Sequence, residues 1–178
     1  MEKKSKKNYK KIGILGGTFD PPHKGHLYIS KIAIKKLSLN KLFWIVTKKN
    51  PLKKKPYLDV KTRIKLSKKI TVKQKKIIVK YLDNKIKSSN TFNLLKHIKK
   101  NQSAELFFLI GSDNLVKFHK WKNWKKIPQL ARVVVFPRQN YSIVSLNSVA
   151  LKSFKKKDWI YINIKRVNIS SSLIRKFW

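Results

Sequence analysis

Short apolar runs alternate with longer amphipathic stretches along this chain, and this alternation is the feature that most restricts its fold. Continuous or β-branched apolar runs predict strands at residues 12–15, 42–46, 77–79, 106–110, 132–136 and 159–164. Helical spacing predicts helices over residues 24–37, from an N-cap at Asp59 to about residue 70, over 91–98 and over 170–177. Strands that alternate with helices predict an α/β fold, an open parallel sheet with helices on both faces.

The composition supports one folded domain over residues 1–178, with a basic, flexible segment at residues 1–11. Hydrophobic residues make up 42% of the chain, which is too many for a disordered protein. There is no internal repeat and no apolar run long enough to cross a bilayer. The absence of cysteine excludes disulfides, thiolate metal sites and a cysteine nucleophile, and it fits a cytoplasmic location.

The net charge of +38 is the unusual property of the composition. A basic surface attracts phosphate backbones, so one interpretation is a nucleic-acid-binding protein. However, the 45 Lys and Arg residues are spread along the whole chain, whereas a dedicated nucleic-acid binder concentrates them on one face or tail. The second interpretation is therefore a lysine-rich composition without a nucleic-acid partner, and we favour it.

A glycine-rich segment follows the first expected strand, where ligands of open parallel sheets bind. It reads Gly-Gly-Thr-Phe-Asp-Pro-Pro-His-Lys-Gly-His from Gly16 to His26. The glycines are expected to permit a tight turn and a close approach of the backbone to phosphate. His23 and His26 are three residues apart at an expected helix N-terminus, where imidazoles and free N–H groups suit a polyphosphate.

Two other interpretations of His23 and His26 are a surface turn with incidental histidines and a zinc site. The zinc site is disfavoured because there is no cysteine and no H-E-x-x-H motif. Only His97 and His119 remain as histidine partners for a metal. No protein-made metal site is expected.

A second segment rich in hydroxyl groups, Asn-Ile-Ser-Ser-Ser-Leu-Ile-Arg, occupies residues 168–175. Ser170 and Ser171 precede an apolar-periodic run, and Arg175 follows about one turn later. Serine hydroxyls, helix N–H groups and a guanidinium all bind phosphate, although an ordinary capped helix has the same pattern.

The two segments together resemble the H-x-G-H and I-S-S-x-x-I-R motifs of the nucleotidyltransferase superfamily, which has a Rossmann-like fold. The F-F-L-I-G-S-D sequence that ends at Asp113, with Trp121 after it, is similar to nicotinate-nucleotide adenylyltransferases. Asn90 replaces the usual aromatic residue of that family's S-Y-T helix start, and Leu94 stands where the helix often has a second threonine. The resemblance covers about residues 12–175.

The resemblance implies two groups of site residues. For ATP they are Gly16, Gly17, Thr18, Phe19, His23, Gly25, His26, Gly111, Asp113, Ser170, Ser171 and Arg175, of which His23, His26 and Arg175 are expected to be catalytic. For the acceptor they are Lys53, Thr91, Trp121 and Arg138. Trp124 is expected only to pack a helix on the sheet, and Arg63 to be a solvated surface residue.

The implied reaction transfers AMP from ATP to nicotinate mononucleotide, giving deamido-NAD and pyrophosphate in NAD biosynthesis. Mg²⁺ would be carried mainly by the ATP phosphates. Small molecules are the expected partners, with no specific nucleic acid and no membrane, and the oligomeric state is left open. The alternatives are a sibling transferase that uses nicotinamide mononucleotide, phosphopantetheine or a CTP-dependent acceptor, and a basic nucleic-acid-binding module.

Overall fold

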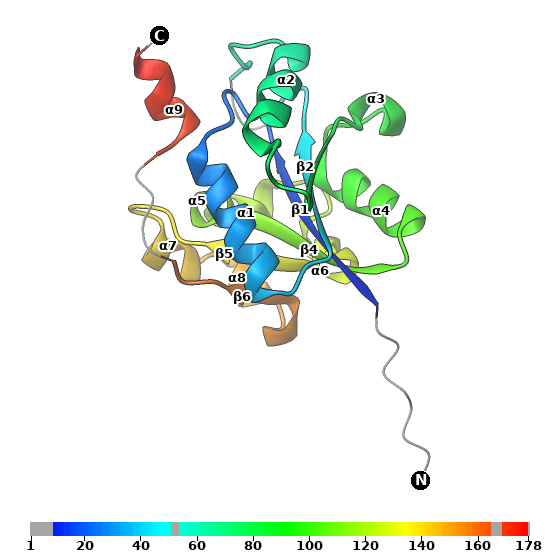
Figure 1. The fold of residues 1–178 in the computed structure, drawn as a ribbon. Coiled ribbons are helices and arrows are strands. Elements are labelled where there is room, and N and C mark those ends of the chain that lie inside the picture. The colour runs from blue at the N-terminus through cyan, green and yellow to red at the C-terminus, as the bar shows by residue number, and fades with distance from the viewer. Residues whose placement is uncertain (1–8, 51–53, 165–168, 178) are drawn as a thin grey trace.

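A computed structural model describes residues 9–50, 54–164 and 169–177. These residues form one sheet of six parallel strands, in the order β3-β2-β1-β4-β5-β6 (Figure 1). The strands are β1 (Lys10–Gly17), β2 (Lys41–Val46), β3 (Ile77–Lys80), β4 (Ala104–Gly111), β5 (Arg132–Phe136) and β6 (Trp159–Tyr161). The strand order reverses direction between β1 and β4, which is the switch point at which such sheets bind ligands.

Helices cover both faces of the sheet, as expected. They are α1 (Lys24–Lys36), α2 (Val60–Thr71), α3 (Asp83–Ile86), α4 (Thr91–Asn101), α5 (Ser112–Val116), α6 (Ile127–Leu130), α7 (Ser142–Leu146), α8 (Val149–Ser153) and α9 (Ser171–Ile174). Short 3₁₀ turns add η1 (Phe118–Lys120), η2 (Trp124–Lys126), η3 (Lys156–Asp158) and η4 (Arg175–Phe177). The Rossmann-like α/β prediction is therefore confirmed.

Two apolar cores lie on opposite faces of the sheet because side chains alternate along each strand. On one face Ile14 and Phe108 pack with Leu95 of α4, Leu115 of α5 and Ala150 of α8. On the other face the core contains Leu15, Trp44 and Leu109, with Ala33 of α1 packed among them and Ile64 of α2 against them. The central strands are apolar on both sides, and this double burial explains why they read as continuous apolar runs.

Several element boundaries differ from the sequence prediction. β1 begins at Lys10, because Lys10 and Lys11 pair with Ala104 and Glu105 of β4, so only residues 1–8 of the expected N-terminal segment lie outside the described residues. The strand expected at 159–164 ends at Tyr161. It is an edge strand whose only described neighbour is β5. After Tyr161, the described pairing with β5 is reduced to one hydrogen bond, from the Ile162 N–H to the Val135 carbonyl. The helix expected at 170–177 is one α turn followed by the 3₁₀ turn η4.

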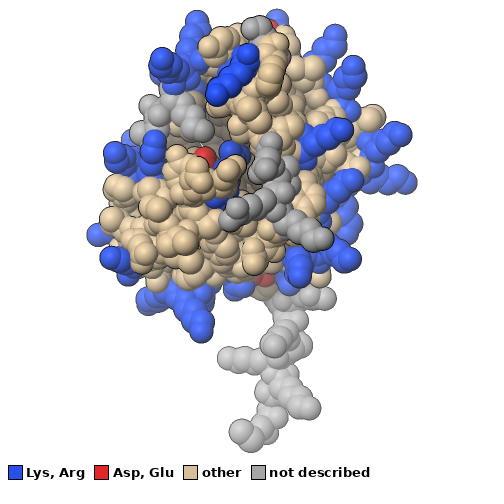
Figure 2. All heavy atoms as spheres, turned by 90° about the vertical axis from the view of Figure 1, so that its left-hand side faces the viewer, with Lys and Arg blue, Asp and Glu red and all other residues tan. Residues whose placement is uncertain are grey.

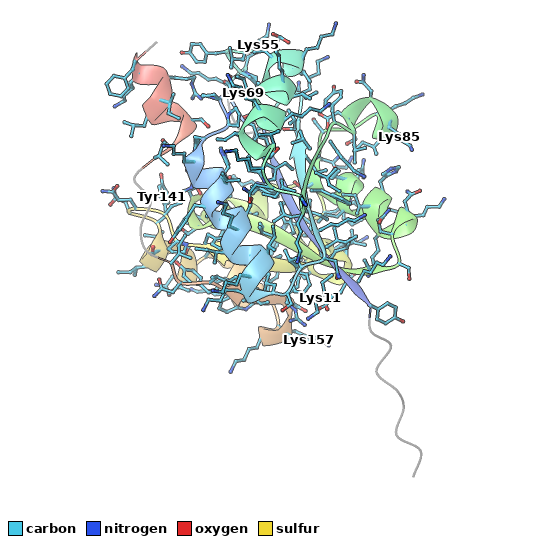
Figure 3. All side chains as sticks on the ribbon, in the orientation of Figure 1. Lys11, Lys55, Lys69, Lys85, Tyr141 and Lys157 are labelled. Atoms are coloured by element: carbon cyan, nitrogen blue, oxygen red, sulfur yellow. The ribbon has the colours of Figure 1, made fainter. Side chains whose placement is uncertain are left out.

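Lysine and arginine side chains are spread over the surface. Figure 2 shows them around most of the visible face, with few acidic atoms among them. The lysines labelled in Figure 3, among them Lys69 on α2, Lys85 on α3 and Lys157, extend from different parts of the fold. Among the described residues, no helix is both long and apolar enough to span a membrane.

Candidate active site

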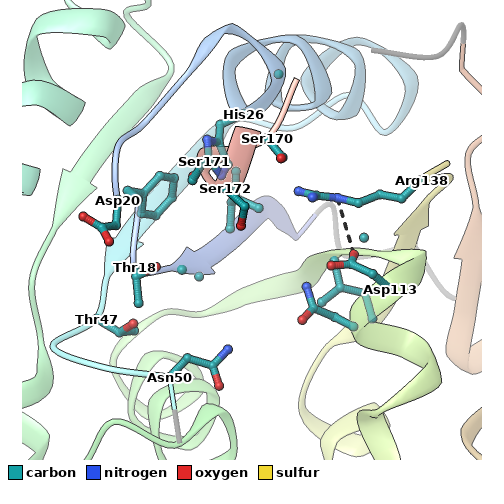
Figure 4. Close-up of a pocket in the computed structure, with 18 of the residues that line it drawn as sticks. Thr18, Asp20, His26, Thr47, Asn50, Asp113, Arg138, Ser170, Ser171 and Ser172 are labelled. Atoms are coloured by element: carbon teal, nitrogen blue, oxygen red, sulfur yellow. Dashed lines mark ion pairs between the residues drawn. The ribbon is translucent and has the colours of Figure 1, made fainter. Parts of the chain in front are cut away.

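A cavity of about 1230 Å³ opens at the carboxyl ends of β1, β2, β4 and β5 (Figure 4). Its walls come from the β1–α1 loop, the segment before α2, the start of α4, the loops after β4 and β5, and α9. Every expected site residue that the structure describes lines this cavity: Gly16, Gly17, Thr18, Phe19, His23, Gly25, His26, Thr91, Gly111, Asp113, Trp121, Arg138, Ser170, Ser171 and Arg175. Lys53 lies outside the described residues.

His23 and His26 hold each other at the N-terminus of α1. His23 is the N-cap, and its Nδ1 accepts a hydrogen bond from the Gly25 N–H at 3.1 Å. Nδ1 of His26 accepts from the His23 N–H at 3.3 Å. A neutral imidazole that accepts at Nδ1 carries its proton on Nε2. Each histidine therefore presents an Nε2–H donor, and the two ring centroids are 3.8 Å apart.

His23 is held in its neutral form. Burial, and after it the positive charge of Arg138, lower the pKa of His23 from 6.5 to about 4. The residue is 4% exposed, and its Nε2 has no hydrogen-bond partner among the residues that the structure describes. A buried donor without a partner costs free energy, so a ligand oxygen placed there would recover a strong interaction.

The lowered pKa of His23 predicts a specific loss of stability in acid. Between pH 6.5 and about 4 the unfolded chain binds a proton at His23 that the folded chain does not bind, so the free energy of unfolding falls as the pH falls through this window. His23→Asn removes this proton and keeps an oxygen that can cap Gly25. Urea unfolding at pH 7 and pH 4.5 should show a smaller acid loss in His23→Asn than in the wild type. Equal losses would contradict the assignment.

An aromatic stack supports the histidines from behind. Phe19 lies between Trp44 and His26, with ring centroids 4.9 Å from Trp44 and 4.8 Å from His26. The Trp44 Nε1–H donates to Ser30 Oγ at 2.8 Å, and Ser30 Oγ donates to the His26 carbonyl at 2.7 Å. The buried Trp44 thus fixes both the ring and the backbone of His26. The sequence gives no sign of this role, because Trp44 is part of an apolar strand.

The tight turn after β1 is made by Phe19 and not by the glycines. Phe19 has a φ of 49°, whereas neither Gly16 nor Gly17 has a positive φ, so the turn does not use the conformational freedom of the glycines. Gly16 and Gly17 are the last residues of β1. Gly25 is required for space instead, since a Cβ there would lie 2.9 Å from the His23 ring and 2.9 Å from Ile169.

Asp20 joins the β1–α1 loop to two distant segments. Its carboxylate accepts from the N–H groups of Tyr57 (2.8 Å) and Leu58 (3.0 Å) and lies 3.7 Å from Arg175 Nη1. Arg175 also donates to the Asp20 carbonyl, and Ser171 Oγ donates to the Pro21 carbonyl at 2.9 Å. Arg175 and Ser171 therefore fasten α9 and η4 to the loop, in addition to lining the cavity.

Arg63 is buried, with 1% of its surface exposed, so the expectation of a solvated residue is wrong. Its Nη1 donates to the carbonyls of Thr18 and Thr47, its Nη2 to Lys48 at 3.1 Å and its Nε to Leu58 at 3.0 Å. These four carbonyls belong to the loops that follow β1 and β2. Arg63 is thus a hub that holds one side of the cavity and does not face it.

A second buried group fastens the same loop from α3. Oδ2 of Asp83 accepts from the Lys48 N–H at 2.7 Å. Burial raises the pKa of Asp83, although the Lys48 bond and the charges of Arg63 and Lys48 oppose this. Lys48 is therefore held through its N–H by Asp83 and through its carbonyl by Arg63.

The opposite wall of the cavity carries an ion pair and an indole. Arg138 Nε lies 3.4 Å from Asp113 Oδ1, and Figure 4 draws Arg138 facing the side that carries His26 and the serines. One face of the Trp121 ring stacks on Phe118, with centroids 4.8 Å apart. Trp124 packs against the apolar core beside Phe154, as expected for a residue with a packing role.

The N-terminus of α4 completes this wall. Asn90, which departs from the family's aromatic residue, is the N-cap, and its Oδ1 accepts from the Asn93 N–H at 2.9 Å. Thr91 follows at the cavity surface, Leu94 belongs to the apolar core and also lines the cavity, and Leu95 is buried in the core. The substitution at position 90 therefore provides a good helix cap.

Known proteins with a similar sequence decide the family. A cytidylyltransferase-like family model matches residues 14–177. A probable nicotinate-nucleotide adenylyltransferase of Pelagibacter ubique (strain HTCC1062) is 48% identical over 166 residues, which are 93% of this chain and 92% of the relative. The chain belongs to the nicotinate-nucleotide adenylyltransferase family. A second probable member, from Ruegeria sp. (strain TM1040), is 32% identical over 93% of this chain and 96% of its own length.

The fold of this adenylyltransferase family member also has solved counterparts. The structure of Plasmodium falciparum nicotinic acid mononucleotide adenylyltransferase complexed with NaAD matches with a TM-score of 0.79 and 24% identity, covering 95% of this chain and 84% of that one. At this identity the match supports the fold alone. The predicted family and fold are both confirmed.

Proposed function

We propose that this enzyme transfers AMP from ATP to nicotinate mononucleotide, releasing pyrophosphate and forming deamido-NAD. The choice of acceptor is carried by the 48% identity to the Pelagibacter relative over 93% of the chain. AMP transfer itself is supported by the two Nε2–H donors at the N-terminus of α1, at the switch point of the sheet.

The reaction we propose is an in-line attack by the acceptor phosphate on the α-phosphorus of ATP. Pyrophosphate leaves with the electrons of the α–β bridging bond, so no covalent enzyme intermediate is needed. Catalysis then depends on positioning and on stabilisation of charge in the transition state. His23 and His26 would donate to the bridging and leaving oxygens, and Ser170, Ser171 and Arg175 would hold the β and γ phosphates with the N–H groups of α9.

The remaining expected residues have roles on both sides of this reaction. The backbone from Gly16 to Phe19 and Gly25 would contact ATP, with Gly111 and Asp113 at its ribose. The acceptor would lie against Thr91 and Arg138, and its pyridine ring against the part of Trp121 that Phe118 leaves uncovered. Lys53 stays a prediction for the acceptor phosphate.

Mg²⁺ would accompany ATP. No group of three or more metal-ligating side chains occurs among the described residues. Asp20 and Asp113 are the carboxylates among the described residues that line the cavity, and they already face backbone N–H groups and Arg138 respectively. This arrangement fits an ion held mainly by phosphates and water, which offsets their negative charge. The cytoplasmic location of the reaction is likewise part of the proposal.

Pyrophosphate release with a panel of substrates tests the proposal. ATP with nicotinate mononucleotide should give the highest kcat/KM, and mass spectrometry should identify deamido-NAD as the product. Nicotinamide mononucleotide, phosphopantetheine and CTP are the matched alternatives. A higher kcat/KM with phosphopantetheine or CTP would overturn the proposal, whereas a preference for nicotinamide mononucleotide would change the acceptor and leave AMP transfer intact.

A further inference from the structure

An exposed apolar face covers α7, α8 and the residue before α7. It consists of Tyr141, Ile143, Val144, Leu146 and Val149, which we call the α7–α8 face. These are five of the ten large apolar side chains that are exposed among the described residues, and they lie within nine positions of one another. Single exposed apolar residues need no explanation, but a cluster of this kind marks an interaction surface.

The same segment has no charge. Residues 139–151 contain no Lys, Arg, Asp or Glu, and this is the longest such stretch in a chain with 45 Lys and Arg among 178 residues. The flanking residues Arg138 and Lys152 are basic again. In Figure 2 a broad tan area lies beneath the central hollow, with blue side chains at its margins. Tyr141 stands at the corresponding side of the fold in Figure 3.

We propose that the α7–α8 face is the contact between two copies of this chain. With a net charge of +38, two copies repel each other wherever lysines face lysines. An uncharged apolar surface escapes this repulsion and matches itself, as a two-fold interface requires. An acidic protein or a nucleic acid would gain most from the lysine-rich surface and nothing from this face, so the charge pattern favours a second copy.

The α7–α8 face adjoins the cavity, so a dimer formed through it would place the partner subunit near the cavity. Tyr141 belongs to the α7–α8 face and also lines the cavity. α7 and α8 both pack against α5, which follows β4 directly at Gly111. The partner subunit would therefore stand beside the rim of the cavity, with the apolar side chains at the centre of the interface and lysines at its edge.

Sedimentation equilibrium of matched variants tests the proposal. The wild type should be a dimer at micromolar concentration, and Ile143→Glu should be a monomer because the carboxylate would be buried without a partner. Val72→Glu is the control, since Val72 lies at the end of α2 and is 78% exposed, as is Ile143. It changes the net charge equally and should remain a dimer.

The effect of NaCl on the dimer dissociation constant distinguishes the proposed apolar contact from an electrostatic one. Raising NaCl from about 0.05 to about 0.5 M screens the repulsion between lysines, so the dimer should become several-fold tighter. A monomeric wild type at micromolar concentration, a dimer that survives Ile143→Glu, or a dimer that weakens in salt would each overturn the proposal. Because Ile143 does not line the cavity, these results are independent of the pyrophosphate assay.

Discussion

Replacing His26 by alanine should lower kcat by about 100- to 1000-fold, which is the usual cost of losing one transition-state donor. Its Nδ1 accepts from the His23 N–H, so a neutral ring carries its proton on Nε2, and His26 lines the cavity where a phosphate oxygen would bind. Because that interaction strengthens as charge develops on the leaving group, the effect should fall mainly on kcat, with a smaller change in the KM for ATP. Steady-state pyrophosphate release measures both constants.

His97→Ala is the matched control for His26. His97 lies on α4 and does not line the cavity, so its removal should leave kcat nearly unchanged. Circular dichroism would verify that both variants keep their secondary structure. If His26→Ala retained turnover within about threefold of the wild type, the assigned role of His26 would be wrong.

Arg63→Met should destabilise the protein by about 3 kcal/mol or more, since hydrogen bonds to charged groups contribute about 1.5 to 3 kcal/mol each and four carbonyls lose their donor. For a chain of this size the corresponding fall in Tm is about 6 to 12 °C. Activity should fall as well, because the carbonyls of Thr18 and Thr47 belong to the loops that shape the cavity. Denaturant unfolding and pyrophosphate release measure the two effects.

Arg132→Met provides the same substitution at a different kind of site. Arg132 and Glu105 form an exposed pair with 3.7 Å between Nη2 and Oε1, so losing it should cost less than about 1 kcal/mol. Arg63→Lys should be intermediate, because lysine keeps the charge without the planar set of five donors. Equal stabilities of Arg63→Met and Arg132→Met would show that the Arg63 hub contributes nothing.

The central strands could be predicted because both of their faces are buried, so periodic and continuous apolar runs reveal them. The helices at residues 83–86, 112–116, 127–130, 142–146 and 149–153 were not predicted, since four or five residues form little more than one turn and show no period. β6 is shorter than expected because an edge strand depends on a single neighbour.

The expected site residues could be named from the sequence because the first motif directly follows a strand and the resemblance to a known family supplied the others. Arg63 and Trp44 could not, since their partners are backbone carbonyls and rings from distant segments, and a sequence pattern does not record such contacts. Asp20 belongs to the first motif, but its bonds to Tyr57 and Leu58 emerge only when the two loops are folded together.

The bonds from Ser171 to Pro21 and from Arg175 to Asp20 join positions that are 150 and 155 residues apart. On the ribosome, the histidine loop is therefore synthesised long before its serine and arginine partners. The cavity acquires its serine and arginine wall only after residue 175 has left the exit tunnel. A chain that stops before Ser171 therefore carries both histidines without this wall of the cavity, and the proposed phosphate site is completed only when that segment has been made.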